Sequence, residues 1–189
     1  MVYSTYSFPQ FPQYRIFATC FTGVSAEKLK EVKEHLVAAD KNYDFCFLNT
    51  NFILSQELLL NSIHKSILNK EFDCMKAKTL NTEIIFNLSP TNKITDAFRS
   101  FGVEEGCSSV IVVHITTGNE NFATVNQHLE GLLSSDSRPE NIKIEDETLS
   151  SFVDVSKFKK LYKLNDAVGA DSYPTLTRLA ISACHLRGL

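Results

Sequence analysis

The sequence predicts an α/β fold: a single compact domain in which a mixed β-sheet of about four to five strands is flanked by helices and followed by a C-terminal helix. Three observations support this prediction. The chain has 189 residues, of which 43% are hydrophobic and 22% charged, as is typical of globular domains. Segments with the periodicity of strands alternate along it with segments that have the periodicity of helices. No internal repeat or long Gly/Ser-rich linker divides it, so we expect one domain over residues 1–189.

Strands are predicted where β-branched and aromatic residues gather in short runs. The run 109–116 is apolar on both faces, so we place it at the centre of the sheet. Residues 1–13 contain Pro9 and Pro12, and we expect an extended lead-in there because proline lacks the amide donor. In chain order, the predicted strands cover residues 14–22, 45–48, 82–88, 109–116 and 142–144.

Helices are predicted where apolar residues recur every three or four positions. Ser25 and Ser55 precede two of these segments and are expected N-caps, and Pro174 is tolerated in the first turn of the last helix. Gly102 follows a short helix, at a place where a left-handed C-terminal residue suits glycine. In chain order, the predicted helices cover about residues 26–38, 56–72, 94–101, 123–133, 147–153, 155–163 and 172–187.

The sequence contains no recognisable catalytic or cofactor motif. The seven glycines are scattered, which excludes a glycine-rich phosphate loop, and no two of the five cysteines have the spacing of a zinc knuckle or a redox pair. The five histidines are isolated from one another, so no metal site is predicted. We therefore expect no enzyme activity, no catalytic residue and no cofactor. One alternative stays open, an enzyme assembled from Cys107, His114 and a carboxylate.

Charge, cysteines and hydrophobic runs restrict the class of protein. Lys and Arg number 19 and Asp and Glu 22, for a net charge of −3, which argues against a dedicated nucleic-acid binder but allows a local basic patch. Cys20 and Cys46 lie among apolar neighbours, and we expect them to be reduced core residues. No apolar stretch approaches the roughly 20 residues that cross a bilayer, and residues 1–5 do not resemble a secretory signal. These features favour the cytosol or nucleus.

Two features favour a binding function. The apolar residues of the predicted helix 172–187 span nearly its whole circumference, so either the domain core covers both sides or a partner protein covers one of them. Lys70, Lys76 and Lys78 cluster near one turn. Such clusters are usually solvated faces, but they contact phosphates where several converge in space.

Residues 75–102 carry the most specific pattern in the chain. They read MKAKTLNTEIIFNLSPTNKITDAFRSFG, and this run closely resembles the signature of the PRPK-binding protein family, the small accessory subunit of the KEOPS (EKC) complex. Residues 8–12, 159–164 and 186–188 also resemble that family, particularly its fungal members. The similarity therefore extends through almost the full length of the chain.

The resemblance implies a function that the residue patterns alone do not. Members of this family are non-catalytic and bind the atypical PRPK-type kinase/ATPase of KEOPS through a helical surface, reaching the other subunits through it. The complex installs a threonylcarbamoyl group on the adenosine next to the anticodon of tRNA, and this subunit helps to engage the tRNA. In fungi the complex is also linked to telomere maintenance and transcription. We therefore expect a nuclear and cytoplasmic protein, found at telomeres, with no membrane partner.

Candidate residues follow from this implied role. The residues expected to bind the kinase are apolar or terminal positions of the last helix: Leu176, Leu179, Ile181, Ala183, Leu186 and Arg187. The residues expected to contact tRNA are the cations within the 75–102 run: Lys76, Lys78, Lys93 and Arg99. A freestanding RNA-binding module is the second alternative, although a net charge of −3 better suits a minor contributor within a complex.

Overall fold

The computed structural model describes residues 2–104, 106–135, 138–167 and 172–187. It forms two compact units, of which the first contains Met1–Asn49 and Val103–Ile144 and the second contains Thr50–Gly102 and Glu145–Leu189. The backbone passes between the units three times, at residues 49–50, 102–103 and 144–145. The organisation as one domain stays a prediction, and each unit is described by itself.

The first unit contains a five-stranded sheet, which confirms the α/β class and the predicted number of strands. Its order is β1-β2-β4-β3, and β5 pairs with β2 beside β1. The pairings β1–β2, β2–β4, β2–β5 and β3–β4 are all antiparallel, so the prediction of a mixed sheet was wrong. The strands are β1 (Ser4–Phe8), β2 (Phe11–Thr22), β3 (Cys46–Asn49), β4 (Ser109–Thr116) and β5 (Glu140–Ile142).

The order of the strands explains why no parallel pair forms. Both β2 and β3 are antiparallel to β4, so these two strands, joined through α1 (Ala26–Val37), run in the same direction. However, β4 lies between them. Its residues Val110–Val113 are completely buried, which confirms the central position predicted for this strand.

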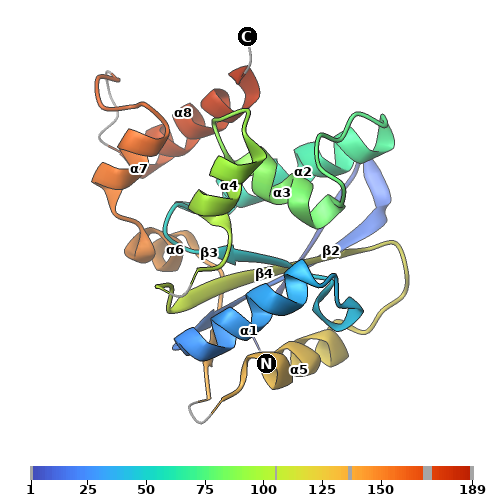
Figure 1. Cartoon of the computed structure of the whole chain (residues 1–189). Helices are drawn as coiled ribbons and strands as arrows, with labels where there is room; N and C mark the ends of the chain where they lie inside the picture. Colours follow the sequence, from blue (N-terminus) through green and yellow to red (C-terminus); the bar gives the residue numbers. More distant parts are fainter. Residues whose placement is uncertain (1, 105, 136–137, 168–171, 188–189) are drawn as a thin grey trace. The chain divides into compact units, whose positions relative to one another are not determined.

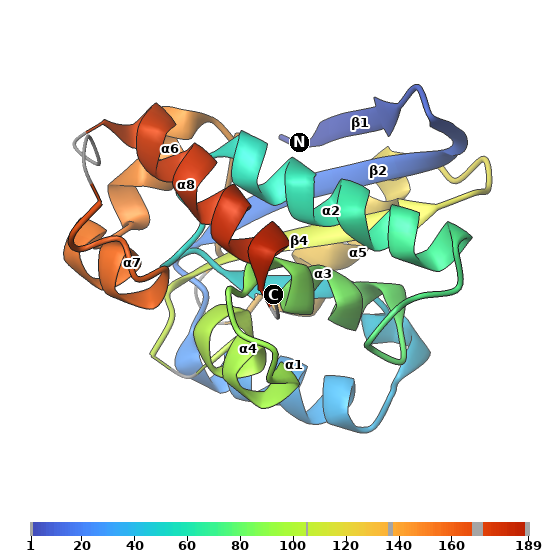
Figure 2. The ribbon, with the colours of Figure 1, turned by 90° about the horizontal axis from the view of Figure 1, so that it is seen from above.

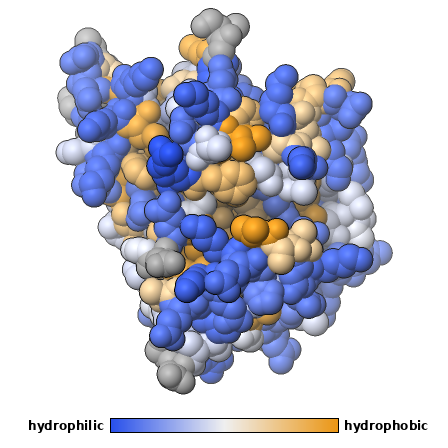
Figure 3. Space-filling view, viewed as in Figure 1, coloured by the Kyte–Doolittle hydropathy of each residue, from blue (hydrophilic) through white to orange (hydrophobic). Residues whose placement is uncertain are grey.

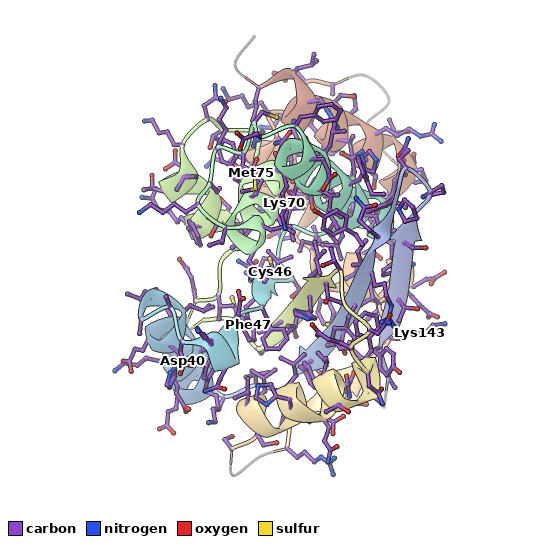
Figure 4. All side chains as sticks on the ribbon, turned by 90° about the vertical axis from the view of Figure 1, so that its right-hand side faces the viewer. Asp40, Cys46, Phe47, Lys70, Met75 and Lys143 are labelled. Atoms are coloured by element: carbon purple, nitrogen blue, oxygen red, sulfur yellow. The ribbon has the colours of Figure 1, made fainter. Side chains whose placement is uncertain are left out.

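The hydrophobic core of the first unit lies on the face of the sheet that α1 and α5 (Phe122–Leu133) cover (Figure 1). Phe17 and Phe21 of β2 meet apolar side chains from both helices there, and Phe47 points into this core from β3 (Figure 4). Leu29, Val32, Leu129 and Leu133 are the helical residues of this cluster. Cys20 and Cys46 are also buried, as predicted, and burial raises the pKa of both thiols, to about 12 for Cys20.

The second unit consists of helices. They are α2 (Gln56–Glu71), α3 (Leu80–Leu88), α4 (Ile94–Phe101), α6 (Asp146–Phe152), α7 (Val155–Leu161) and α8 (Tyr173–Leu186). The helices α2 and α8 lie side by side (Figure 2). Three hydrogen bonds join them: one between the hydroxyls of Ser55 and Thr177 at 3.0 Å, one from Lys65 Nζ to the Cys184 carbonyl at 3.1 Å, and one from His185 Nε2 to Asn61 Oδ1 at 2.9 Å.

Two segments differ from their predicted conformation. Residues 82–88 form most of α3 rather than a strand, because Thr79 caps a helix by accepting a hydrogen bond from the Thr82 amide. Ile84–Leu88 are buried, and periodicity cannot separate a short, wholly buried helix from a buried strand. The predicted lead-in contains β1, because Pro9 lies in the turn after Phe8 and outside the paired residues; the register of β1 with β2 shifts between Tyr6 and Phe8.

Helix ends follow the sequence more closely. Ser25, Ser55 and Ser172 are N-caps whose hydroxyls accept backbone N–H groups, and Pro174 lies in the first turn of α8. Gly102 ends α4 as predicted, but with an extended backbone (φ −69°, ψ 163°) rather than a left-handed one. A Cβ at this position would lie 2.6 Å from the Phe98 carbonyl oxygen, so close packing rather than a positive φ requires glycine.

Candidate partner-binding surfaces

All the residues predicted to bind the kinase or tRNA belong to the second unit. They fall into two groups, one on α8 and one on α4 and the segment between α2 and α3. The face of this unit over α4 and α7 is mostly hydrophilic, with small hydrophobic areas between the polar side chains (Figure 3). Among the residues that the structure describes, this face therefore shows no single large hydrophobic patch, and each candidate residue is taken by itself.

Helix α8 has one buried side and one partly exposed side. Leu176, Ala180 and Cys184 follow one another at four-residue intervals and are at most 3% exposed, so they form the buried side. Burial raises the pKa of the Cys184 thiol to about 11. Leu176 is therefore a core residue of this unit, and its direct contact with a partner stays a prediction. The core covers one side of this helix rather than both.

The predicted apolar residues that remain accessible lie on the flanks of α8. Leu179, Ala183 and Leu186 share one flank because they stand at positions i, i+4 and i+7. Leu186 is 61% exposed and the other two are half-buried. We call these three residues the α8 flank. Ile181 is half-buried on the opposite flank.

Arg187, also predicted to contact the kinase, is occupied within the unit. Its guanidinium donates hydrogen bonds to the carbonyls of Phe86 and Ser89 and to the Asn87 side-chain oxygen, the last at 2.6 Å. Its Cζ also lies 3.7 Å from the centroid of the Phe86 ring. Arg187 therefore attaches the end of α8 to the C-terminus of α3, where a cation also interacts favourably with the helix dipole. In this structure its guanidinium is bonded within the unit, and its contact with the kinase stays a prediction.

The predicted tRNA-binding cations are all exposed. Lys76 and Lys78 lie between α2 and α3, in residues 72–79, which we call the 72–79 segment and which Lys70 and Met75 help to locate in Figure 4. Lys93 is the N-cap residue of α4, and Arg99 lies on that helix, 3.6 Å from Asp96. The three lysines are therefore accessible to an anionic partner, whereas Arg99 is exposed but forms an ion pair with Asp96.

Sequence reasoning missed two exposed aromatic residues near these cations. Phe72 is 71% exposed at the C-terminus of α2, and Phe98 is 41% exposed on α4. The sequence pattern assigns both residues only to helices, because periodicity marks an apolar residue as part of a core and does not show that its side chain is exposed. The signal in the sequence that could have identified Phe72 as a binding residue is its position close to Lys70 and Lys76.

Sequence reasoning also missed Glu83, which is completely buried in the first turn of α3. Its Oε2 accepts hydrogen bonds from the amides of Lys76 and Ala77 at 3.0 and 2.8 Å. Its Oε1 accepts one from Asn69 Nδ2 at 2.7 Å and a longer one from Asn87 Nδ2 at 3.5 Å. Glu83 is an acidic residue that directly precedes the mostly apolar run 84–88. This acidic residue beside a buried run was the signal that could have identified the site.

The residues of the alternative Cys–His enzyme belong to the first unit, where Cys107 precedes β4 and His114 lies toward its other end. Cys107 packs against the hydrophobic core, and His114 Nε2 is paired with Glu120 Oε2 at 2.8 Å. This pairing holds the pKa of Glu120 below its usual value. Within the described part of the chain, no three His, Cys, Asp or Glu side chains are grouped so as to hold a metal ion, and no helix could cross a membrane.

Comparisons with known proteins agree with the resemblance of the 75–102 run. A family model described as "Kinase binding protein CGI-121" matches residues 21–188. The chain is 48% identical to the EKC/KEOPS complex subunit CGI121 of Debaryomyces hansenii, over 100% of both chains. It is 40% identical to the same-named subunit of Candida albicans, over 96% of both chains, and 30% identical to that of Aspergillus fumigatus, over 83% of this chain and 82% of the relative.

Proposed function

The chain belongs to the CGI-121 family, and from this membership we propose that it is a non-catalytic subunit of the EKC/KEOPS complex that binds the kinase of that complex. The observation that carries the proposal is the 48% identity to a protein named as this subunit, which extends over both chains completely. The other subunits then associate with the chain through the kinase.

The α8 flank is the proposed kinase contact. Leu179, Ala183 and Leu186 form a short apolar row on a helix, and Leu186 is 61% exposed. Exposed apolar side chains in a row of this kind commonly insert into a hydrophobic groove of a partner. The opposite side of α8 is fixed by its buried residues, so this row is presented on a rigid support.

The second proposed partner is tRNA, on which the complex places a threonylcarbamoyl group. Lys76, Lys78, Lys93 and Arg99 are exposed and can reach phosphates. Phe72 is exposed near the first two and is suited to stacking on an unpaired base. The net charge of −3 supports a shared rather than a sole contact with RNA, which argues against a freestanding RNA-binding module.

A role in telomere maintenance and transcription, with a nuclear and cytoplasmic address, completes the proposal. It rests on the resemblance to fungal members of the family. Tagging the protein at its own locus and measuring its occupancy on telomeric chromatin tests it, and a signal equal to that of an untagged strain would reject this part alone.

To test the kinase contact, the Leu186→Asp variant of this protein is prepared, and its affinity for the kinase from the same organism is compared with that of the wild type. The charge would face the apolar surface of the kinase, so we expect at least a tenfold weaker complex, on the order of 1.4 kcal/mol. Deleting α8 is a poorer test, because it would also uncover the core residues packed against Leu176 and Ala180.

The matched control is Val37→Asp. Val37 is 84% exposed and ends α1, so this variant also places a carboxylate near a helix C-terminus but leaves α8 unchanged. We expect it to bind the kinase like the wild type. Equal affinities for Leu186→Asp and the wild type would show that the α8 flank is not the contact.

A further inference from the structure

Glu83 is a completely buried carboxylate in α3, at a position where an apolar side chain would be enough to pack the helix. Removing a carboxylate from water is unfavourable unless hydrogen bonds replace its hydration. The four donors around Glu83 are the amides of Lys76 and Ala77 and the side-chain amides of Asn69 and Asn87. Two of the four are consecutive backbone groups of the 72–79 segment, so this side chain determines the path of that segment.

The two backbone amides converge on one oxygen, Oε2, at 3.0 and 2.8 Å. Successive amides that point at a single anionic oxygen form an anion-binding concavity, and here the anion is supplied by the chain itself. The attachment draws Ala77 inward, to 9% exposure, while Lys76 and Lys78 on either side of it remain exposed. Glu83 therefore holds the backbone between two lysines whose side chains face solvent.

The site is also connected to the rest of the unit. Asn87 Nδ2 donates to Ser66 Oγ of α2 at 2.8 Å, and Asn87 Oδ1 accepts from Arg187 at the end of α8. Asn69, which donates to Glu83 Oε1, belongs to α2. The 72–79 segment is therefore attached, through one carboxylate, to side chains of three helices.

We propose that Glu83 is a positioning residue, which fixes the 72–79 segment so that Lys76 and Lys78 are preorganised for phosphates of RNA. The inference rests on the proposed contact with tRNA. A partner surface that is ordered before binding does not lose conformational freedom on binding, so its affinity is higher than that of the same charges on a mobile loop. The second residue of the segment, Asp73, has a positive φ of 51°, a conformation that Asp tolerates.

Glu83→Gln tests this proposal because it keeps the shape of the side chain and removes its charge. Its NH₂ group is a donor that meets other donors whichever oxygen it replaces, either the amides of Lys76 and Ala77 or the side-chain amides of Asn69 and Asn87. We expect faster hydrogen exchange at Lys76 and Ala77 and about tenfold weaker binding of a tRNA transcript that reads codons starting with A. The affinity for the kinase should stay at the wild-type value.

The salt dependence of tRNA binding separates positioning from direct contact. Glu83→Gln should keep the wild-type slope, because the lysines can still reach phosphates after ordering. Lys76→Ala and Lys78→Ala should each reduce the slope by about 0.7–0.9, the value for one lost phosphate contact. The matched control is Glu57→Gln, which makes the same charge change at an exposed position of α2.

The possible results reject different parts of the proposal. Unchanged exchange at Lys76 and Ala77 in Glu83→Ala, which removes both acceptor oxygens, would show that this residue does not fix the segment. Faster exchange with unchanged tRNA affinity, while Lys76→Ala weakens binding, would reject its positioning role. If neither lysine variant changes tRNA binding, the proposed tRNA contact fails instead. Should Glu83→Gln not fold, Asn69→Ala removes the 2.7 Å bond from the half-exposed end of α2 and is expected to show the same effects.

Discussion

The two proposed partner surfaces of the second unit are supported in different ways. The α8 flank lies on a helix of 14 residues, whose other side is fixed by the buried side chains of Leu176, Ala180 and Cys184. The 72–79 segment lies outside the helices, and the Glu83 carboxylate holds its backbone. Many small apolar contacts therefore support the first surface, whereas the second depends on one polar side chain.

Because of this difference, the residues that contact a partner and the residues that hold the surface in place are arranged differently in the two regions. On α8, the accessible residues and the supporting residues are different positions of one helix, so they can be changed independently. In the 72–79 segment, the support comes from a residue of α3 and acts on the backbone next to the lysines.

The largest expected effect is on the buried side of α8. Leu176→Ala removes a side chain that is 2% exposed and leaves a cavity, so we expect the free energy of unfolding to fall by about 2–5 kcal/mol. Leu186→Ala, at a 61% exposed position of the same helix, should change it by less than about 0.5 kcal/mol. Urea denaturation of both variants measures this difference. Similar losses for the two would mean that α8 has no distinct buried and accessible sides.

The second effect concerns the support of the 72–79 segment. Glu83→Ala leaves the amides of Lys76 and Ala77 and the side chain of Asn69 without their acceptor, and we expect a loss of about 2–3 kcal/mol. Glu57→Ala, at an exposed position, should cost less than about 0.5 kcal/mol. Thermal and urea unfolding measure both. Equal stability of the two variants would contradict the description of Glu83 as a satisfied, buried carboxylate.

A somewhat smaller effect is expected where α8 meets α3. Arg187→Ala removes the donor to the carbonyls of Phe86 and Ser89 and to Asn87, so the unit should lose about 2 kcal/mol. Arg178→Ala, an exposed arginine on the same helix, is the control and should be nearly neutral. If the two arginine variants unfold at the same urea concentration, Arg187 does not attach α8 to α3.

The smallest effect is a difference in thiol reactivity between the two regions. Cys184 on α8 is 3% exposed, and burial raises its pKa to about 11, so little thiolate is present at pH 8. Cys74 in the 72–79 segment is exposed. An aromatic disulfide reagent should therefore modify Cys74 first, and the slow reaction of Cys184 should accelerate as the pH rises toward 11. Faster labelling of Cys184 than of Cys74 at pH 8 would contradict the burial of this side of α8.

The fold was predictable where the local pattern determines the structure. The runs of β2, β3 and β4 are apolar on both faces, and Ser25, Ser55 and Ser172 mark helix starts that the structure contains. Strand direction was not predictable, because β4 enters between β2 and β3 from a distant part of the chain. The helix at 80–88 was mistaken for a strand since its buried residues leave no polar face to reveal a period.

The candidate sites were predictable only in part. Periodicity placed Leu179 and Leu186 on a helix, but it could not show that Leu176 faces the core and that Arg187 is bonded to α3. These facts depend on contacts across about 100 residues of sequence, such as that between Arg187 and Asn87, separated by 100 positions. Glu83 was missed for the same kind of reason, since its role depends on amides that carry no sequence signal.

The most direct test of the central claim is hydrogen exchange of the full-length protein, alone and with the kinase from the same organism. We expect the kinase to slow exchange in residues 179–187 and to leave residues 72–79 unchanged, whereas a tRNA transcript should slow exchange in residues 72–79. Slower exchange in 72–79 on addition of the kinase, with no change in 179–187, would contradict the assignment of the α8 flank as the kinase-binding surface.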